Sequence, residues 1–181
     1  MQLPNGRFVD PKTVTTHFHL RPGDQVADYG AGSGYFVREL AAAVGEEGKV
    51  YACEIQKSLV EKIGELARQD GLEQVQVLWC DLEAPGGTKL QDNVLDAAIL
   101  VNTLFQIDDK PGACQEITRT LRPGGKLFVI DWSESFAGLG PQESAVVSEA
   151  NARALFEDCG FTFERSFDAG DHHYGIALRH D

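Results

Sequence analysis

The feature that most constrains this chain is a glycine-rich stretch near its N-terminus, which reads VADYGAGSGYF at residues 26–36. Three glycines within five residues remove three Cβ atoms, so the backbone can turn tightly and a ligand can lie against it. The apolar residues before the turn predict a strand over residues 25–29, and the pattern after it predicts a helix over residues 34–44. The turn therefore presents free backbone N–H groups at a helix N-terminus, which predicts a binding loop of the nucleotide type.

The spacing of the glycines leaves the ligand of this loop open. Dinucleotide-binding turns follow the pattern G-x-G-x-x-G, whereas this turn reads G-x-G-x-G and has Asp28 two residues before it. A carboxylate beside the turn repels a pyrophosphate and suits a cofactor that carries positive charge and no phosphate. S-adenosylmethionine (SAM), with its sulfonium and ammonium groups, is such a cofactor. A tight turn without any ligand is the remaining interpretation.

Size and charge narrow the class of protein. With 181 residues, 43% of them hydrophobic, the chain is expected to form a single domain over residues 1–181, in which residues 1–20 are a lid or arm. A net charge of −12 disfavours a nucleic-acid substrate, because such binding depends on Lys and Arg. No apolar run approaches the roughly 20 residues that span a membrane, and the first residues lack the features of a signal peptide. We therefore expect a cytoplasmic protein.

The four cysteines are widely spaced and form no C-x-x-C pair. Three of them fall within apolar patterns. We expect buried, reduced thiols rather than disulfides or a metal site.

The order of predicted elements indicates the fold class. Turn residues are expected at 122–125, and residues 82–93 are too broken by Pro and Gly for a long helix. Strands are predicted at 25–29, 49–55, 75–80, 94–101, 126–132, 162–167 and 173–179, and helices at 34–44, 57–69, 109–121 and 142–159. This alternation predicts an α/β fold with a doubly wound, mostly parallel, seven-stranded sheet and helices on both faces. The short connection at 168–171 cannot cross over, so the last two strands are either an antiparallel hairpin or not adjacent.

Four features together resemble the class I SAM-dependent methyltransferases over about residues 15–180. They are the D-x-G-x-G-x-G motif, Glu54 at the end of the second strand, Asp81 after the third, and LRPGGKL at residues 121–127. The resemblance implies that Glu54 accepts hydrogen bonds from the ribose and Asp81 from the adenine amino group. The cofactor-binding residues it implies are Asp28, Gly30, Gly32, Gly34, Glu54, Ile55, Asp81, Leu82 and Asn102.

The methyl acceptor is less constrained than the donor. Residues 102–105 do not read N/D-P-P-Y/F, the motif of many enzymes that methylate amino nitrogens of bases or glutamine. The region resembles small-molecule methyltransferases of the ubiquinone/menaquinone-biosynthesis type, so the leading hypothesis is an enzyme that methylates a small molecule. A protein lysine methyltransferase and a non-catalytic SAM-binding partner subunit are the alternatives.

No motif identifies a catalytic base, and none is needed unless the acceptor must lose a proton. The weak catalytic candidates are Asn102, Asp131 and His19, and further polar candidates are His17, Glu134, His172 and His173. Adjacent strand residues point to opposite faces, so the His172-His173 pair is not expected to bind a metal.

The segments that can close over the pocket are short. Aromatic residues that may pack there or in the core are Phe8, Phe18, Phe105 and Phe136. Two interpretations stand: the pocket is open to a protein side chain or a large substrate, or a second subunit closes it in a homodimer.

Overall fold

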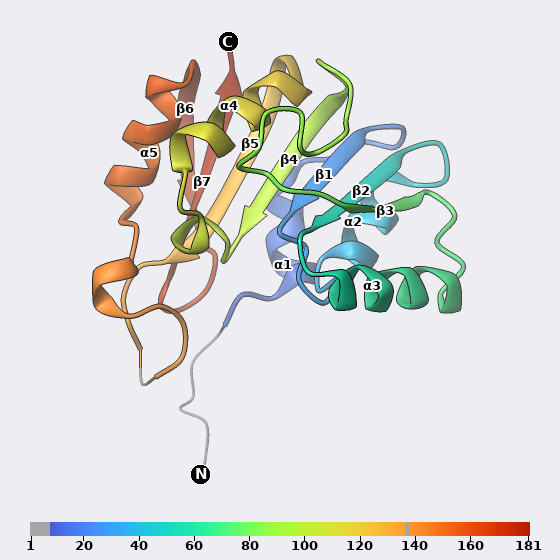
Figure 1. The fold of residues 1–181 in the computed structure, drawn as a ribbon, viewed down its shortest axis with the longest axis horizontal. Helices are drawn as coiled ribbons and strands as arrows, with labels where there is room; N and C mark the ends of the chain where they lie inside the picture. Colours follow the sequence, from blue (N-terminus) through green and yellow to red (C-terminus); the bar gives the residue numbers. More distant parts are fainter. Residues whose placement is uncertain (1–7, 137) are drawn as a thin grey trace.

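The structure is a computed structural model that describes residues 8–136 and 138–181. In this part of the chain, seven strands form one sheet in the order β3-β2-β1-β4-β5-β7-β6 (Figure 1). The strands are β1 (Gln25–Tyr29), β2 (Lys49–Glu54), β3 (Val75–Trp79), β4 (Leu95–Val101), β5 (Leu121–Trp132), β6 (Phe161–Phe167) and β7 (His173–His180). The predicted seven-stranded sheet is therefore confirmed.

The directions of the strands follow from the lengths of their connections. The strands β1 to β5 pair in parallel, and β7 pairs antiparallel with both β5 and β6. Residues 168–172 join β6 directly to β7, which is too short for a crossover. Of the two arrangements that the sequence left open, the antiparallel hairpin is the one observed.

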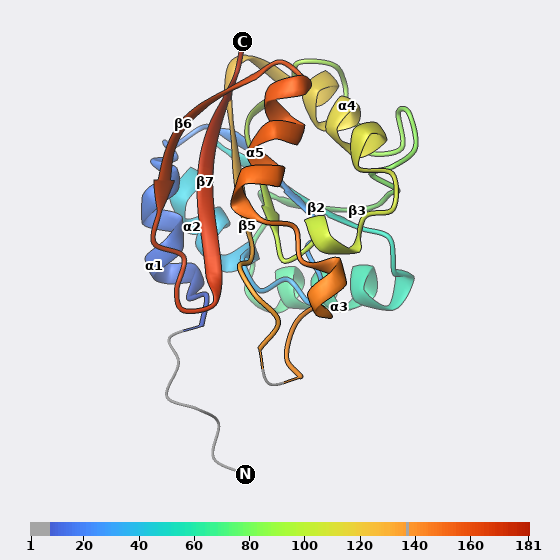
Figure 2. The ribbon, with the colours of Figure 1, turned by 90° about the vertical axis from the view of Figure 1, so that its left-hand side faces the viewer.

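Helices cover both faces of the sheet. They are α1 (Pro11–Thr15), α2 (Val37–Val44), α3 (Lys57–Gln69), α4 (Lys110–Thr120) and α5 (Glu149–Asp158), with short 3-10 turns η1 (Thr16–Phe18), η2 (Leu104–Gln106) and η3 (Glu143–Ala145). Figure 2 shows α1 and α2 on one side of the strands and α4 and α5 on the other. Two main apolar clusters fill the space between the helices and the sheet. One contains Leu40 and Val26, and the other contains Ile117 and Val129.

The central strand β4 shows why one acid can stand in a buried strand. Every residue from Ala97 to Leu100 is buried, as the continuous apolar run predicts for a strand covered on both faces. Asp96 accepts a hydrogen bond from the Gln25 backbone N–H at 2.7 Å and pairs with Arg122 at 2.6 Å. The carboxylate thus anchors the start of β1 and the start of β5.

The turn predicted at residues 122–125 lies inside β5. Pairing with β4 passes from Leu95↔Leu121 to Ala97↔Lys126, so β5 carries extra residues that leave the ladder as a bulge. Gly124 has a φ of 79°, a conformation that favours glycine. The strand therefore begins at Leu121, before the predicted turn.

The helix predicted over 142–159 begins later, at Glu149. Gln142 and Val146 are extended, and Glu143–Ala145 form only a 3-10 turn. Ser148 is the N-cap, because its hydroxyl accepts a hydrogen bond from the Asn151 N–H at 3.2 Å. This cap, rather than the apolar pattern, sets the start of α5.

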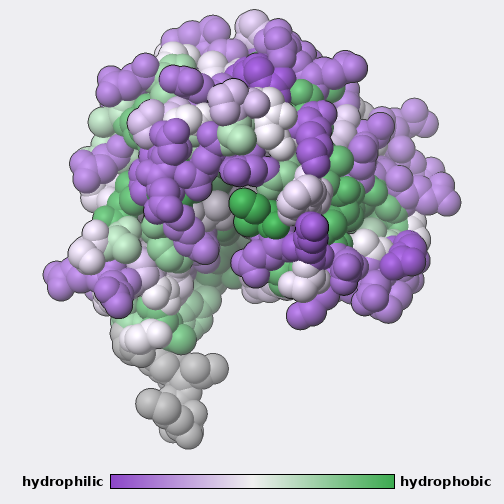
Figure 3. All heavy atoms as spheres, viewed as in Figure 1, coloured by the Kyte–Doolittle hydropathy of each residue, from purple (hydrophilic) through white to green (hydrophobic). Residues whose placement is uncertain are grey.

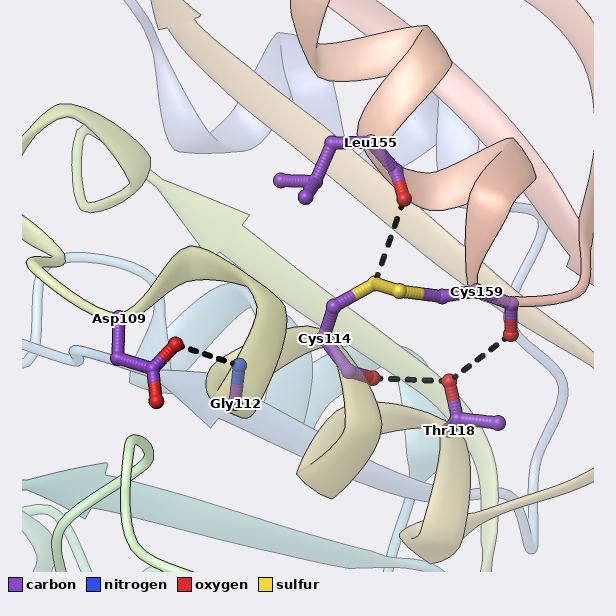
Figure 4. Close-up of a disulfide and its surroundings, with 6 residues drawn as sticks. All are labelled: Asp109, Gly112, Cys114, Thr118, Leu155 and Cys159. Atoms are coloured by element: carbon purple, nitrogen blue, oxygen red, sulfur yellow. Dashed lines mark hydrogen bonds between the residues drawn. A yellow bond between two sulfur atoms is a disulfide. The ribbon is translucent and has the colours of Figure 1, made fainter.

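The expectation that all four cysteines are reduced thiols is wrong for two of them. Cys114 in α4 and Cys159 at the end of α5 form a disulfide with their Cα atoms 6.4 Å apart (Figure 4). The Thr118 hydroxyl lies beside it and donates to the Cys114 carbonyl at 2.8 Å. Cys53 and Cys80 are free and buried, as expected. The two cysteines are 45 residues apart, so the sequence pattern did not show that α4 and the end of α5 meet.

No helix among the described residues is long and apolar enough to span a bilayer. Residues 1–7 of the predicted lid lie outside the described residues. Of its remainder, Val9, Val14 and Phe18 are core residues, and the Phe18 ring lies 4.6 Å from that of Phe128.

The irregular segment after β3 is held against α4 by a buried carboxylate. Glu116 accepts hydrogen bonds from the Gly86 N–H and from the N–H and hydroxyl of Thr88, and it pairs with Arg119 at 2.7 Å. Burial acts to raise the pKa of Glu116, but these hydrogen bonds prevail and lower it to about 2. The segment that leads away from β3 is therefore fixed without a helix of its own.

Replacing Glu116 by Ala is expected to lower the free energy of unfolding by about 2–4 kcal/mol, because Arg119 and two backbone N–H groups lose their acceptor. Thermal unfolding followed by circular dichroism measures the change. The control is Glu65→Ala on the exposed face of α3, which should stay within about 0.5 kcal/mol of wild type. Equal stability of the two variants would contradict the conclusion that Glu116 holds the segment after β3 against α4.

Candidate functional site

A cavity of about 530 Å³ lies at the carboxyl edge of β1, β2, β3 and β4, the lower edge of the sheet in Figure 1. In open α/β sheets this edge is where ligands bind. The cavity is lined by the glycine turn, the end of β2, the start of the segment after β3, and the loop after β4. Of the predicted cofactor-binding residues, it brings together Asp28, Gly30, Gly32, Glu54, Ile55, Asp81, Leu82 and Asn102.

Gly34 is the one predicted residue that does not line the cavity. Its φ is 84°, and a Cβ there would meet the Ile63 side chain of α3 at 3.4 Å. Gly34 therefore serves the packing of the turn on α3. By contrast, a Cβ on Gly30 would lie 2.5 Å from the Thr103 hydroxyl oxygen, so this glycine lets the turn approach the loop after β4.

The Glu54 carboxylate joins two walls of the cavity. One oxygen accepts hydrogen bonds from the backbone N–H groups of Ile55 and Gln56, each at 2.9 Å. The other oxygen accepts from the Gly32 N–H at 2.9 Å. The side chain is buried, yet the oxygen that faces Gly32 keeps a lone pair for a ligand hydroxyl.

Asp28 is a buried acid at the bottom of the cavity, with 3% of its surface exposed. No described residue donates a hydrogen bond to its carboxylate. Burial raises its pKa to about 7, and the nearby negative charge of Glu54 adds to the rise. A buried carboxylate without a donor is destabilising unless a ligand supplies the donor or a positive charge.

Asp81 and Asn102 add two more acceptors. One Asp81 oxygen accepts from the Glu83 N–H at 2.9 Å, which leaves the other oxygen open. Asn102 has a φ of 51°, rare for a residue other than glycine, and its N–H donates to the Ile130 carbonyl at 2.8 Å. Its side-chain oxygen is buried with no hydrogen-bond partner among the described residues. Left-handed Asn102 thus marks a site that a ligand would complete.

Asp131 does not line the cavity and has a different role. It is buried at the end of β5, and its carboxylate accepts from the N–H groups of Trp132 at 2.8 Å and Phe105 at 3.2 Å. Burial raises its pKa to about 6, although these backbone hydrogen bonds lower it in part. Asp131 therefore positions the η2 turn that follows Asn102.

The remaining candidates are spread over the molecule. His19 lies at the amino edge of the sheet, where it lines a second cavity of about 370 Å³ with Asp24 and Arg122. The His17 ring stacks on Phe167 with the ring centroids 5.1 Å apart. The Nδ1 atom of His172 lies 2.6 Å from a carboxylate oxygen of Glu134 at the carboxyl edge.

Sequence reasoning missed several lining residues. They are Tyr35, Cys53, Leu59, Thr103 and Gln106. Tyr35 directly follows the glycine motif, and Thr103 follows Asn102, so proximity to a motif was the available signal. Among the described residues there is no group of three or more His, Cys, Asp or Glu that could hold a metal ion.

The cavity is thus rich in residues that carry acceptors, because Asp28, Glu54, Asp81 and Asn102 all line it. Such a lining repels a pyrophosphate. It suits a ligand with hydroxyl and amino donors and a positive charge.

Comparison with known proteins agrees with this geometry. Residues 20–165 match the family described as "Methyltransferase domain". A ubiquinone/menaquinone biosynthesis C-methyltransferase of Chromobacterium violaceum is 33% identical over 129 residues, which cover 71% of this chain and 51% of that protein. A 2-phytyl-1,4-naphtoquinone methyltransferase of Trichormus variabilis is 32% identical over 62% of this chain and 48% of its own length. The chain spans about half the length of these curated relatives.

A solved structure matches over nearly the whole chain. The crystal structure of a SAM-dependent methyltransferase from Aquifex aeolicus superimposes with a TM-score of 0.88 and 29% identity, covering 96% of this chain and 91% of the other. One family is indicated by the sheet order, by the glycine turn with its preceding acid, and by the match over residues 20–165. The chain belongs to the methyltransferase domain family and has the fold of the class I SAM-dependent methyltransferases.

Proposed function

We propose that this chain binds SAM in the cavity at the carboxyl edge and transfers its methyl group to a small-molecule acceptor. The observation that carries the proposal is the buried Asp28 carboxylate, which has no donor of its own beside a glycine turn that leaves room for a ligand. A cofactor with positive charge and no phosphate supplies what this carboxylate lacks.

The donor groups of SAM fit the acceptors that the cavity offers. The ribose hydroxyls suit the Glu54 oxygen that faces Gly32, and the adenine amino group suits the open oxygen of Asp81. The ammonium group suits the Asp28 carboxylate, which has no donor of its own among the described residues. Ile55 is 57% exposed and lines the cavity with Leu82, so the two supply apolar surface for the adenine ring.

SAM, when bound, supplies an electrophilic methyl group on a leaving group that needs no protonation. The contribution of the chain is to hold the donor and to line up the acceptor, which is where most of the rate acceleration of such a displacement originates. Asp131 fixes η2, and Thr103 donates to the Val101 carbonyl at 2.9 Å. Both contacts hold the loop that borders the cavity between the donor and the acceptor.

The acceptor we propose is a small aromatic ring of the quinone and hydroquinone class. The similarity to a ubiquinone/menaquinone biosynthesis C-methyltransferase and to a 2-phytyl-1,4-naphtoquinone methyltransferase supports this choice. Aromatic side chains also line or flank the edge: Tyr35 is 63% exposed and Phe36 lines the cavity. The homodimer and the cytoplasmic location remain predictions, and light scattering of the purified protein checks the former.

The proposal is tested with methyl-labelled SAM. The protein should transfer label to a small-molecule extract or to 1,4-dihydroxynaphthalene, and titration calorimetry should show binding of SAM and S-adenosylhomocysteine. Label in the protein fraction alone would favour a protein methyltransferase. Binding without any label transfer would favour a non-catalytic subunit, and binding of NAD in place of SAM would refute the proposed donor.

Replacing Asp28 by Asn separates ligand binding from stability. At pH 8 without ligand, the variant is expected to gain about 1–3 kcal/mol in the free energy of unfolding, because it removes a buried charge. In the wild-type native state, Asp28 keeps its proton up to a pKa of about 7. The destabilisation of the wild type by ionised Asp28 is therefore complete above pH 7 and fades as the pH falls toward 4. At pH 5 the gain should therefore be small. Thermal unfolding at the two pH values measures it.

The same Asp28→Asn variant should bind SAM more weakly than wild type at pH 8. Wild-type affinity should rise between pH 6 and pH 8 as the carboxylate ionises, and the variant should lose this dependence. A variant that is destabilised equally at pH 5 and pH 8 would show that Asp28 is instead a structural acceptor.

Replacing Glu54 by Gln is expected to weaken SAM binding by about 1–3 kcal/mol, or roughly 10- to 100-fold, because one of its oxygens becomes a donor that faces other donors. Titration calorimetry checks the value. Glu61→Gln, on the exposed surface of α3, is the matched control and should bind SAM like wild type.

A further inference from the structure

A carboxylate and an imidazole meet at the carboxyl edge of the sheet, where β5 ends and β7 begins. Glu134 lies in the loop after β5, and His172 is the last residue before β7. The His172 Nδ1 lies 2.6 Å from a Glu134 oxygen. An ionised carboxylate can only accept, so Nδ1 carries the hydrogen and the lone pair remains on Nε2. An imidazole oriented in this way by an acid has the arrangement of a general base.

The ring of His172 is held in place from several directions. It stacks on Phe136 with the centroids 3.7 Å apart and the planes 19° from parallel, and Phe8 lies 6.4 Å away on centroid distance. The Ser133 N–H donates to the His172 carbonyl at 2.9 Å. The φ of His172 is 64°, an uncommon conformation for a residue other than glycine. The backbone and the ring are therefore both constrained, as is common at functional sites.

Neither Glu134 nor His172 lines the cavity, and two sets of contacts lie between the pair and the lining residues. Tyr35 lines the cavity, and its hydroxyl donates to the carbonyl of Val9, the neighbour of Phe8. On the other side, the Asn102 N–H donates to Ile130, two residues before the end of β5. Figures 1 and 2 show the loop after β5 and the β6–β7 turn at the same edge of the sheet as the start of α2. Asp81 and Ile55 lie on the β2 and β3 side, so the pair stands on the opposite side from the residues assigned to adenosine.

The surroundings of the pair are apolar enough for an aromatic acceptor. Leu139 is 38% exposed and bridges to Phe136 across the loop after β5. Figure 3 shows hydrophobic side chains on this face of the molecule, bordered by hydrophilic ones. A ring could lie against these side chains while a hydroxyl reaches the imidazole.

We propose that the Glu134–His172 pair is the general base that takes the proton from a hydroxyl group of the aromatic acceptor; this inference rests on the function proposed above. The proton passes from the hydroxyl oxygen to His172 Nε2. The electron pair of the resulting phenolate forms the new bond to the methyl carbon. The electrons of the broken carbon–sulfur bond return to sulfur, which becomes a neutral thioether, and the imidazolium releases its proton to solvent.

The neighbouring His173 does not suit this role. Its Nδ1 lies 3.0 Å from the Asp171 carbonyl oxygen, and its ring lies 4.2 Å from Trp132. The Nε2 atom is shielded from solvent. An acceptor could reach this atom only by displacing packed side chains, whereas 20% of the His172 side chain is exposed.

The test uses two histidines with the same backbone conformation. His172 and His19 have φ angles of 64° and 50°, and asparagine tolerates this conformation. His172→Asn should lower kcat for methylation of 1,4-dihydroxynaphthalene about 100-fold or more. His19→Asn, at the far edge of the sheet, should keep wild-type kcat. Glu134→Gln should lower kcat less, by roughly 10-fold, since the ring stays stacked on Phe136.

Three further readings keep the inference falsifiable. All variants should bind SAM within about twofold of wild type, because an exposed ion pair contributes little to the fold. Wild-type kcat in His172→Asn would overturn the inference. Intact SAM binding by the wild type without methylation of 1,4-dihydroxynaphthalene would overturn it too and leave the proposed donor standing, whereas loss of SAM binding by the wild type would refute the proposed function itself.

Discussion

The site depends on the Glu54 carboxylate, because this one group holds two strands' ends in a fixed relation. It accepts from the backbone after β2 and from Gly32 in the turn after β1. The glycines of the turn have no side chains, so its position is fixed by this contact, by the packing of the Ala31 methyl group in the core, and by hydrogen bonds from Gly30 and Ala31 to the Cys53 carbonyl. Glu54 is thus a structural acceptor in the free protein, and the same side chain is the one proposed to bind the ribose.

Asp28 differs from Glu54, whose carboxylate accepts several hydrogen bonds in the free protein. The Asp28 carboxylate takes part in no hydrogen bond with the described residues, and its burial beside Glu54 raises the cost of ionising it. Such a group reduces the stability of the empty protein. It gains a favourable interaction only when a positive charge enters the cavity. In the proposed complex, part of the binding energy for SAM would come from satisfying this acid.

The parts that the sequence predicted well are those set by local patterns. The predicted bounds of β1 and α3 agree with the structure, because each has a clear apolar period and a definite end at glycine or a turn. The start of α5 was wrong, since the cap at Ser148 decides it. The disulfide between Cys114 and Cys159 was missed because it depends on how two helices meet. Within the site, acids at strand ends were found from their motif, but Asp131 looked similar in sequence and turned out to face the η2 backbone.

The same contrast between local patterns and long-range contacts separates the part of the site that holds the methyl donor from the part proposed for the acceptor. The donor side is built from strand ends, whose positions follow from the parallel ladder once β1, β2, β3 and β4 are in register. The segments proposed for the acceptor are the loop after β5 and the β6–β7 turn, which are 16 and 5 residues long between their flanking elements β5, α5, β6 and β7. Glu134 and His172 are 38 residues apart and meet only because β5 and β7 are antiparallel neighbours. A hairpin at the end of the sheet therefore places this polar pair at the carboxyl edge, in a part of the fold that no local sequence motif marks.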